Sequence, residues 1–471
     1  MLRLFDTRSR QAEQVEPTRR GQLRVFSCGP PAYRYAHVGD LRTALLADLI
    51  RRAAHRHRLS VLVCRGSNDV GGLAADGQAD AVGPRDGEVG NRRTDASQVY
   101  ADALLADCSA LNIRPPDYAP RASESMGLIT DMIGELISGG RAYATAEGSV
   151  YFDARTFPGY GALSGNQPPA TAADPQRRFD ADWALWRGDR GGSDRGRDAR
   201  EGGGLTWAAP WGPGVPSQDI ACSAMSRHYL GDVIDIHAGG IDLRFPHHEN
   251  ERAQSDAAAG HEVVGHWVHG ELVLFEGTKL PAAADPVLAD PVLLGDLAQR
   301  GLDPLALRLA FLDHRYRERL DLTWPGLADA DRALRGWREQ VATWATHPSR
   351  PMSAPHVAEI ADAFDDDLDT PAAIRVLRDL AATTEAPPGS KFETFAHVDQ
   401  LFGLDLAREV GRTPTPAPAP AGAERLLAER AAARAEQDWA SADRLTEELA
   451  RRGVTVSDTP AGQHWTVERG R

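Results

Sequence analysis

Two short apolar runs flank a helical pattern near the start of the chain. Residues 23–28 are apolar and favour a strand, and the Gly-Pro-Pro sequence at 29–31 ends that run. Apolar residues recur with helical spacing over 41–54, and the continuous apolar run 59–64 is typical of a buried parallel strand. This order predicts a strand, a helix and a second parallel strand, which is the arrangement of a nucleotide-binding half-sheet.

Helical periodicity dominates the rest of the chain. A strand is predicted at 233–236, shortly before a helix that opens with the sequence HHENE. Two segments interrupt the helices: 165–218, where runs of Gly, Arg, Asp and Pro predict a partly mobile loop, and 412–421, a Pro/Ala linker. The predicted helical segments are 95–111, 123–140, 246–258, 289–346, 355–404, 423–436 and 439–452. A predicted strand-turn-strand unit follows them.

Composition and charge narrow the class of protein. A length of 471 residues predicts several domains, and 42% hydrophobic residues are typical of a globular protein. The net charge is −14. So acidic a chain is a poor non-specific binder of nucleic acid, although a local basic face for RNA is compatible with it. No apolar run is long enough to span a membrane, and the N-terminus lacks the apolar stretch of a secretory signal. Four widely separated cysteines form no disulfide framework and favour a reducing cytoplasm.

Four residues with metal-binding side chains stand out. Cys28 ends the first strand, Cys222 lies in the sequence DIACSAM, and His247 and Glu251 are four apart at the start of a helix. A spacing of four puts both side chains on one face of the helix, where they can bind the same metal. Two thiolates, an imidazole and a carboxylate can form a tetrahedral zinc site. The alternative is that the cysteines are buried core residues and the His-Glu pair stabilises the helix end.

Several longer motifs carry a resemblance that extends this interpretation. They are CGPPAYRYAHVGDLRT, IACSAM followed by DIHAGGIDLRFPHHENERAQS, DLDTPAA, and DWASADRLTEELARRGVTVSDTPAGQHW. Together they resemble the cysteinyl-tRNA synthetase family of class I aminoacyl-tRNA synthetases, from residue 1 to about residue 467. The resemblance implies that Cys28, Cys222, His247 and Glu251 bind one zinc ion, and that the substrate thiolate binds this zinc directly. Serine offers a harder, less acidic ligand, so such a site selects cysteine.

The resemblance also implies a fold, a reaction and partners. The expected fold is α/β, with a Rossmann-type class I synthetase catalytic core (1–115 and 216–290) that contains a connective insertion (116–215). A junction subdomain (291–346), an α-helical anticodon-binding-type bundle (350–411) and a small C-terminal tRNA-binding-type module (422–471) are expected to follow. The expected reaction is activation of cysteine by ATP, with Mg²⁺ accompanying ATP, and transfer of cysteine to tRNA. The protein is expected to be a cytoplasmic monomer.

By the same resemblance, ATP is expected to lie between two motifs and a glycine-rich strand end. The catalytic residues of the motifs are His37 and Asp40 of the sequence HVGD, and Lys279, which occupies the first lysine of the second motif. The expected nucleotide contacts are Gly39, His237, Gly239, Gly240 and Asp242.

Both ATP-handling motifs depart from the family pattern, which has a histidine in place of Asp40 and a second lysine in place of Ala282. Asp40 puts a carboxylate in the path of the polyphosphate, where a like charge costs on the order of 4 kcal/mol. Ala282 removes a group that stabilises the transition state, a loss that typically costs about 100- to 1000-fold in rate. Pro281 is expected to stiffen the same loop. These departures predict cysteine activation at least about 100-fold slower than in a typical synthetase.

The residues expected around the amino acid also differ from the family pattern. Gln218 replaces a tryptophan that walls the cysteine pocket, and Asp219 replaces the histidine beside it. Asn68 replaces a threonine near the substrate amine, while the acidic Asp69 remains. These changes have two interpretations: adaptation to a different or larger thiol amine, and drift in a redundant paralogue.

Three functional hypotheses remain. The first is a cysteine--tRNA ligase-type protein whose activity is weak or lost. The second is a repurposed paralogue that joins cysteine or a related thiol amine to a small-molecule amine or carrier. Ala306–Glu318 resembles a segment of the mycothiol-pathway cysteine ligase, but that enzyme group lacks the C-terminal tRNA-binding bundle that this chain keeps. The third is a non-catalytic zinc- and tRNA-binding protein, which Asp40 and Ala282 favour.

Overall fold

A four-stranded parallel sheet lies under the predicted motifs. Its strands are β3 (Gln22–Cys28), β4 (Ser60–Gly66), β9 (Ile234–Gly240) and β10 (Val264–Gly270), in the order β10-β9-β3-β4. All three pairings are parallel, so the carboxyl ends of the strands meet at one edge of the sheet. The strands predicted at 23–28, 59–64 and 233–236 are confirmed, and β9 continues four residues further than predicted.

The computed structural model describes the chain as two compact units, Met1–Arg408 and Glu409–Arg471. The described residues are 1–30, 32, 34–70, 91–167, 174–189, 206–280, 292–412, 423–452, 454–459 and 462–467. Among the described helices, none combines the length and the apolar character that a membrane crossing requires.

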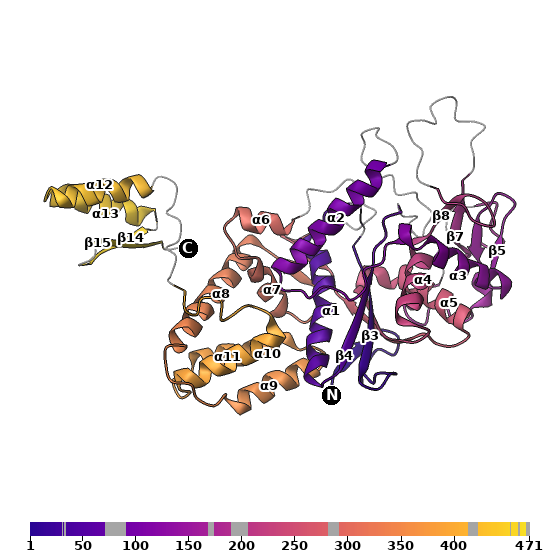
Figure 1. Cartoon of the computed structure of the whole chain (residues 1–471), viewed down its shortest axis with the longest axis horizontal. Helices are drawn as coiled ribbons and strands as arrows, with labels where there is room; N and C mark the ends of the chain where they lie inside the picture. The colour runs from indigo at the N-terminus through magenta and orange to yellow at the C-terminus, as the bar shows by residue number, and fades with distance from the viewer. Residues whose placement is uncertain are drawn as a thin grey trace, which may run out of the picture. The chain divides into compact units, whose positions relative to one another are not determined.

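Helices cover both faces of the sheet (Figure 1). α1 (Val38–Arg56), which confirms the helix predicted over 41–54, packs against β3 and β4. α4 (Gln218–Leu230) packs on the same strands from the other side, and α5 (His247–Ala259) packs on α4. Successive residues of a strand point to opposite faces. Val25 therefore joins the apolar core under α1, whereas Phe26 and Cys28 join the core that contains α4.

A small antiparallel sheet follows the first half of the parallel sheet in the chain. Its strands are β5 (Ala142–Ala144), β6 (Val150–Phe152), β7 (Trp183–Gly188) and β8 (Gly214–Pro216), and α3 (Met126–Ser138) packs nearby. The helix predicted over 123–140 is confirmed as α3, preceded by the short 3-10 turn Ala122–Glu124, and the helix predicted over 95–111 corresponds to α2 (Asn91–Ala110). The predicted mobile loop contains β7 and β8, and its segments 168–173 and 190–205 lie outside the described residues.

Helices also form the later part of the first unit. They are α6 (Leu294–Gln299), α7 (Pro304–Leu312), α8 (Trp324–Trp344), α9 (Ala354–Asp365), α10 (Thr370–Ala382) and α11 (Pro388–Phe402). The helical patterns predicted over 289–346 correspond to α6, α7 and α8, but β13 (Leu320–Leu322), a strand between α7 and α8, was not predicted. This strand pairs with β11 (Val273–Phe275), which also pairs with β12 (Thr278–Lys279). A hairpin of β1 (Arg3–Asp6) and β2 (Gln11–Gln14) begins the chain.

The second unit has its own small core. It consists of α12 (Ala423–Ala435), α13 (Trp439–Arg451) and the antiparallel pair of β14 (Val454–Thr459) and β15 (Gly462–Val467). These elements confirm the two helices and the strand-turn-strand unit predicted for this part of the chain. Residues 413–422, which include nearly all of the predicted Pro/Ala linker, lie outside the described residues.

A buried ion cluster joins α1 to the later helices. Asp48 of α1 accepts hydrogen bonds from Arg52 Nε at 2.7 Å and from Arg308 Nη2 of α7 at 2.9 Å. The side chains of Asp48 and Arg308 have no exposed surface. The remaining N–H groups of the two arginines donate to the backbone carbonyls of Leu111, Asn112, Gln400 and Phe402. The cluster therefore holds α7 against α1, the helix that follows β3.

Candidate functional site

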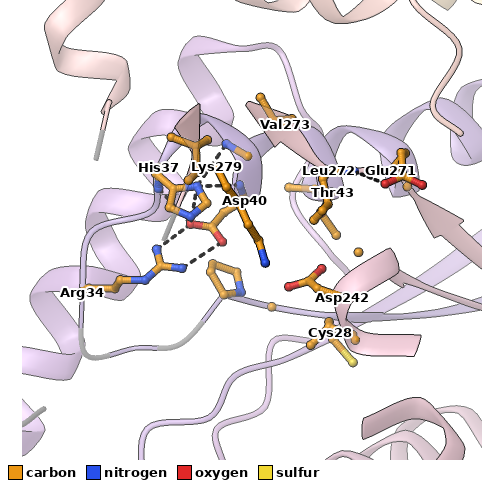
Figure 2. Close-up of a pocket in the computed structure, with 18 of the residues that line it drawn as sticks. Cys28, Arg34, His37, Asp40, Thr43, Asp242, Glu271, Leu272, Val273 and Lys279 are labelled. Carbon is orange, nitrogen blue, oxygen red and sulfur yellow. Dashed lines mark hydrogen bonds and ion pairs between the residues drawn. The ribbon is translucent and has the colours of Figure 1, made fainter. Parts of the chain in front are cut away.

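A cavity of about 130 Å³ opens at the carboxyl edge of the parallel sheet. The strand order reverses direction at β3, whose neighbours are β4 on one side and β9 on the other, and ligands of such sheets bind in the crevice at this point. Cys28 at the end of β3 lines one side of the cavity, His37 and Asp40 of the α1 start line another, and Lys279 approaches from β12 (Figure 2). Segments far apart in the sequence, among them 28–44, 240–243 and 270–280, therefore meet around one cavity.

The predicted metal ligands are brought together at the Cys28 end of this cavity. Cys28 Sγ lies 3.6 Å from His247 Nε2 and 3.6 Å from Glu251 Oε1, while His247 Nε2 lies 2.9 Å from Glu251 Oε1. Two ligands of a tetrahedral zinc with ordinary Zn–S and Zn–N bonds are separated by about 3.6 Å. The two distances from Cys28 Sγ therefore match those between ligands of one zinc ion, whereas His247 Nε2 and Glu251 Oε1 lie within hydrogen-bonding distance of each other.

Cys222 of α4 lies next to this cluster, although it is not among the donor atoms that all lie within 4.8 Å of one another. Its thiol interacts with Cys28 and with His247, and both thiols are buried. The hydrogen bond with Cys28, and His247 acting against the effect of burial, lower the pKa of Cys222 to about 6. The Cys222 hydrogen bond, burial and Glu251 raise the pKa of Cys28 well above its usual value. A low-pKa thiol favours the thiolate that binds metal, so the donor set fits zinc.

A histidine that the sequence interpretation missed also reaches this cluster. His248 Nε2 lies 3.4 Å from Cys28 Sγ, and a grouping by distance alone unites Cys28, His247, His248 and Glu251 within 4.8 Å. The His248 ring is held by His269, whose Nε2 lies 2.8 Å from His248 Nδ1. Burial lowers the pKa of His248 well below its ordinary value, so the ring is neutral. The repeated histidine in HHENE was the available signal for this residue.

His237, predicted as a nucleotide contact, lies beside the metal cluster. Its Nε2 is 3.5 Å from Cys28 Sγ, and its ring stacks on Trp267 with the ring centroids 4.6 Å apart. Gly239, another predicted nucleotide contact, packs against His248, since a Cβ at Gly239 would lie 2.5 Å from the His248 ring. Neither His237 nor Gly239 lines the cavity.

The other predicted nucleotide contacts do line the cavity. Gly39, Gly240 and Asp242 surround the space next to His37 and Lys279. Burial raises the pKa of Asp242, and Lys279 partly opposes this shift. Figure 2 shows Lys279 and Asp242 at the same side of the cavity. Pro281 and Ala282 of the second motif lie outside the described residues.

Asp40 is neutralised by an arginine that the sequence interpretation missed. Arg34 donates from Nη1 to Asp40 Oδ2 at 2.6 Å and from Nη2 to Asp40 Oδ1 at 3.2 Å, as the dashed lines in Figure 2 show. Asp40 also accepts the His37 backbone N–H at 2.8 Å, while His37 Nδ1 accepts the backbone N–H groups of Gly39 and Asp40. This reciprocal pattern is a capping box. Arg34 therefore pairs with the carboxylate that is expected to repel phosphate, a partner that the expectation for Asp40 did not include.

The predicted substrate residues are dispersed. Gln218 at the start of α4 lines the cavity together with Cys28, whereas Asn68 and Asp219 do not line it. Asn68 is buried and its Oδ1 accepts the Val70 backbone N–H. Asp219 lies behind His247, whose Nδ1 is 2.5 Å from Asp219 Oδ1.

The acidic Asp69 is also occupied elsewhere. Its two oxygens accept the backbone N–H of Ser123 at 2.9 Å and the Ser123 hydroxyl at 2.5 Å, and Arg121 lies 3.5 Å away. Its side chain is 1% exposed. Asp69 therefore holds the turn before α3, and it does not line the cavity.

Measurement of bound zinc can distinguish two sets of ligands, one in which Cys222 joins Cys28, His247 and Glu251, and one in which His248 takes the place of Cys222. Purified protein is expected to hold about one zinc per chain, and Cys222→Ala is expected to reduce the content to near zero, because zinc prefers thiolate ligands. His248→Gln is the matched control and should keep its zinc. Loss of zinc from His248→Gln with retention in Cys222→Ala would replace Cys222 by His248 in the ligand set. Near-zero zinc in the unmodified protein would contradict both sets.

Comparison with known proteins assigns the chain to a family. Residues 14–332 match the family described as tRNA synthetases class I (C) catalytic domain, and residues 418–465 match the Cysteinyl-tRNA ligase anticodon binding domain. The fold is therefore that of a class I tRNA synthetase. More particularly, the chain belongs to the cysteine--tRNA ligase family.

Curated relatives extend over the full length of the chain. Cysteine--tRNA ligase of Leifsonia xyli subsp. xyli is 36% identical over 494 residues and covers 99% of this chain and 99% of its own. Cysteine--tRNA ligase 1 of Burkholderia lata is 37% identical over 476 residues, covering 98% of this chain and 96% of its own.

Solved structures show the same fold at low sequence identity. Methionyl-tRNA synthetase of Mycobacterium tuberculosis, in complex with methionyl-adenylate, has a TM-score of 0.53 at 13% identity and covers 82% of this chain and 92% of its own. The Agrobacterium radiobacter K84 agnB2 LeuRS, in a ternary complex with tRNA and LeuAMS, has a TM-score of 0.56 at 11% identity and covers 83% of this chain and 84% of its own.

Proposed function

We propose that this protein activates cysteine with ATP at a zinc site and transfers it to tRNA, at a rate well below that of a typical synthetase. The proposal rests on one observation: the same cavity is lined by a cysteine of the buried two-thiol cluster and by predicted nucleotide contacts. Cys28 belongs to both, since it contacts His247 and Glu251 and also lines the cavity with His37 and Lys279.

The metal end of the site selects the substrate. Cys28, Cys222, His247 and Glu251 would hold the zinc, which when bound supplies positive charge and a ligand position for the substrate thiolate. All four side chains are nearly excluded from water, and electrostatic interactions are stronger in such a site. Gln218 lines the cavity beside Cys28, where its amide can hydrogen-bond the polar end of the amino acid.

The other end of the cavity holds the nucleotide. Gly39 and Gly240 have no side chain, so the backbone can approach the nucleotide closely, and Asp242 offers oxygens to its hydroxyl groups. His37 and Lys279 supply nitrogen donors for the phosphates, whose Mg²⁺ would come with ATP. Positioning and charge stabilisation are the main work of the protein in such a reaction. With Ala282 in place of a second lysine, part of that charge is missing.

The second unit is proposed to contact tRNA. It corresponds to the region that matches the anticodon binding domain, and it carries its own buried core. We also propose that the chain before the second unit divides into a catalytic core at 1–115 and 216–290, an insertion, a junction subdomain and a helical bundle. We further propose that the protein is a cytoplasmic monomer.

Cysteine-dependent exchange of pyrophosphate with ATP tests the proposed reaction. The purified, zinc-loaded protein is expected to exchange at a measurable rate at least about 100-fold below a typical synthetase, because Ala282 lacks the transition-state charge. Exchange at the ordinary rate would contradict the proposed impairment. No exchange with any thiol amino acid, in protein that contains zinc, would instead favour a non-catalytic zinc- and tRNA-binding protein.

One observation favours a second candidate, the repurposed ligase. Gln218 presents a polar amide where the family pattern has a tryptophan, and it lines the same cavity as Cys28. A larger thiol amine with an additional polar group would suit this position. Faster exchange with such a compound than with cysteine would support this candidate, and a small-molecule amine or carrier would then be the expected acceptor.

A further inference from the structure

Asp219 is aimed at the back of a proposed metal ligand. It is buried at 3% exposure, and its Oδ1 lies 2.5 Å from His247 Nδ1. The opposite ring nitrogen, His247 Nε2, lies 3.6 Å from Cys28 Sγ and 2.9 Å from Glu251 Oε1. Asp219 and the cluster of metal donors therefore hold the two sides of one imidazole ring.

The other oxygen of Asp219 is fixed as well. Asn250 Nδ2 donates to Asp219 Oδ2 at 2.7 Å, and Asn250 Oδ1 accepts the Tyr160 hydroxyl at 2.6 Å. Asn250 is 1% exposed and Tyr160 is 8% exposed, so water does not compete for these bonds. A buried chain of hydrogen bonds thus leads from Tyr160 through Asn250 and Asp219 to His247.

Two helix faces build this arrangement. Asp219 and Cys222 are three residues apart on α4, so both face α5. His247, Asn250 and Glu251 form the facing side of α5, with spacings of three and four. Asp219 also lies in the first turn of α4, where the helix dipole favours a negative charge. Each helix therefore contributes metal donors and also residues of the hydrogen-bond chain that lies behind those donors.

We propose that Asp219 is a positioning residue for the metal site, which orients His247 and fixes its tautomer so that Nε2 points at the metal. A carboxylate that accepts the Nδ1–H of an imidazole leaves Nε2 as the ligand atom and raises its basicity. This proposal rests on the proposed metal site. It assigns Asp219 to the support of a metal ligand, whereas the sequence had placed Asp219 in the substrate pocket. Asn250 and Tyr160 act through Asp219 and hold its carboxylate in the plane that His247 requires.

Zinc affinity tests the proposal without reference to enzymatic activity. Competition with a chromogenic chelator should show zinc binding to Asp219→Asn that is about 10- to 100-fold weaker than in the unmodified protein. The visible spectrum of the cobalt-substituted variant should also change, because the orientation of one ligand changes. Asp182→Asn is the matched control, since Asp182 is equally buried and hydrogen-bonded, to Tyr143 and Ala154, but touches no metal donor. It should bind zinc normally.

The outcomes separate this proposal from the metal site itself. Equal zinc affinity and equal cobalt spectra in Asp219→Asn and the unmodified protein would overturn the role of Asp219 and leave the metal site standing. Absence of zinc from the unmodified protein would overturn both. Thermal unfolding in excess chelator shows whether the variant lost general stability, which a positioning role does not require. If Asp219→Asn does not fold, Asn250→Ala replaces it: weaker zinc binding supports the chain of hydrogen bonds, and unchanged binding overturns it.

Discussion

A lysine at position 282 is expected to raise the rate of cysteine-dependent pyrophosphate exchange by about 100- to 1000-fold. The expected gain equals the usual loss when one group that stabilises a transition state is removed. Lys279 lines the cavity and is the first lysine of the motif, while Ala282 stands where the family pattern has the second. The measurement is exchange with zinc-loaded Ala282→Lys, and Ala282→Met is the control that adds length without charge.

Restoring a histidine at position 40 is expected to bring no comparable gain. Asp40 forms a two-point ion pair with Arg34 and a capping box with His37, so Asp40→His would remove the partner of Arg34 and part of the helix cap. The double variant with Ala282→Lys should therefore exchange no faster than Ala282→Lys alone. A large gain from Asp40→His would show that Asp40 itself obstructs the phosphates. No gain from Ala282→Lys would mean that the remodelled pocket, at Gln218, limits the reaction with cysteine.

Replacing Asp48 by alanine is expected to lower the free energy of unfolding by about 3–5 kcal/mol, the usual cost of removing one partner of a buried ion pair. Arg308 would be left without its carboxylate in a site with no exposed surface. Burial lowers the pKa of Arg308 to about 10, against the effect of Asp48, so the guanidinium stays charged at neutral pH. Urea unfolding followed by circular dichroism would measure the change. Asp329→Ala is the control, since the Arg332–Asp329 pair is 61% and 70% exposed and should contribute little.

The Asp48–Arg308 ion pair makes the free energy of unfolding depend on pH. Burial alone would raise the pKa of Asp48, but Arg308 and Arg52 hold this pKa below its ordinary value. The stabilisation by Asp48 is therefore complete above the unfolded-state pKa of about 3.9 and is lost as the pH falls through the lower folded-state pKa. The difference in stability between the unmodified protein and Asp48→Ala should narrow only in that acidic range. A difference that is small at neutral pH would contradict the role assigned to the cluster.

Local pattern alone was sufficient for much of the fold. The apolar runs 23–28 and 59–64 and the helical spacing of 41–54 predicted β3, β4 and α1, because a buried strand and an amphipathic helix each leave their own period in the sequence. The helices and strands of the second unit followed in the same way. The prediction failed at β13, since a strand of three residues is too short to show a period.

The metal cluster, too, could be predicted from the sequence only in part. The sequence named Cys28, Cys222, His247 and Glu251 as candidate ligands but left a structural role for them open, and it was the resemblance to a family that favoured a shared metal. The sequence could not show that His248 also reaches Cys28, or that His237 lies beside Cys28. Those positions depend on how β9 and α5 pack, and packing between distant segments leaves no spacing to read.

The sequence by itself determined which residues are candidates for the site. They are two thiols, a His-Glu pair on one helix, and two motifs that lack a histidine and a lysine of the family pattern. Only the tertiary structure decided how those residues act on one another. It matched the charge of Asp40 with Arg34 and turned Asp219 toward His247. Both results have one physical cause, which is that the energy of a charge depends on its partners and its exposure to water, and folding sets both.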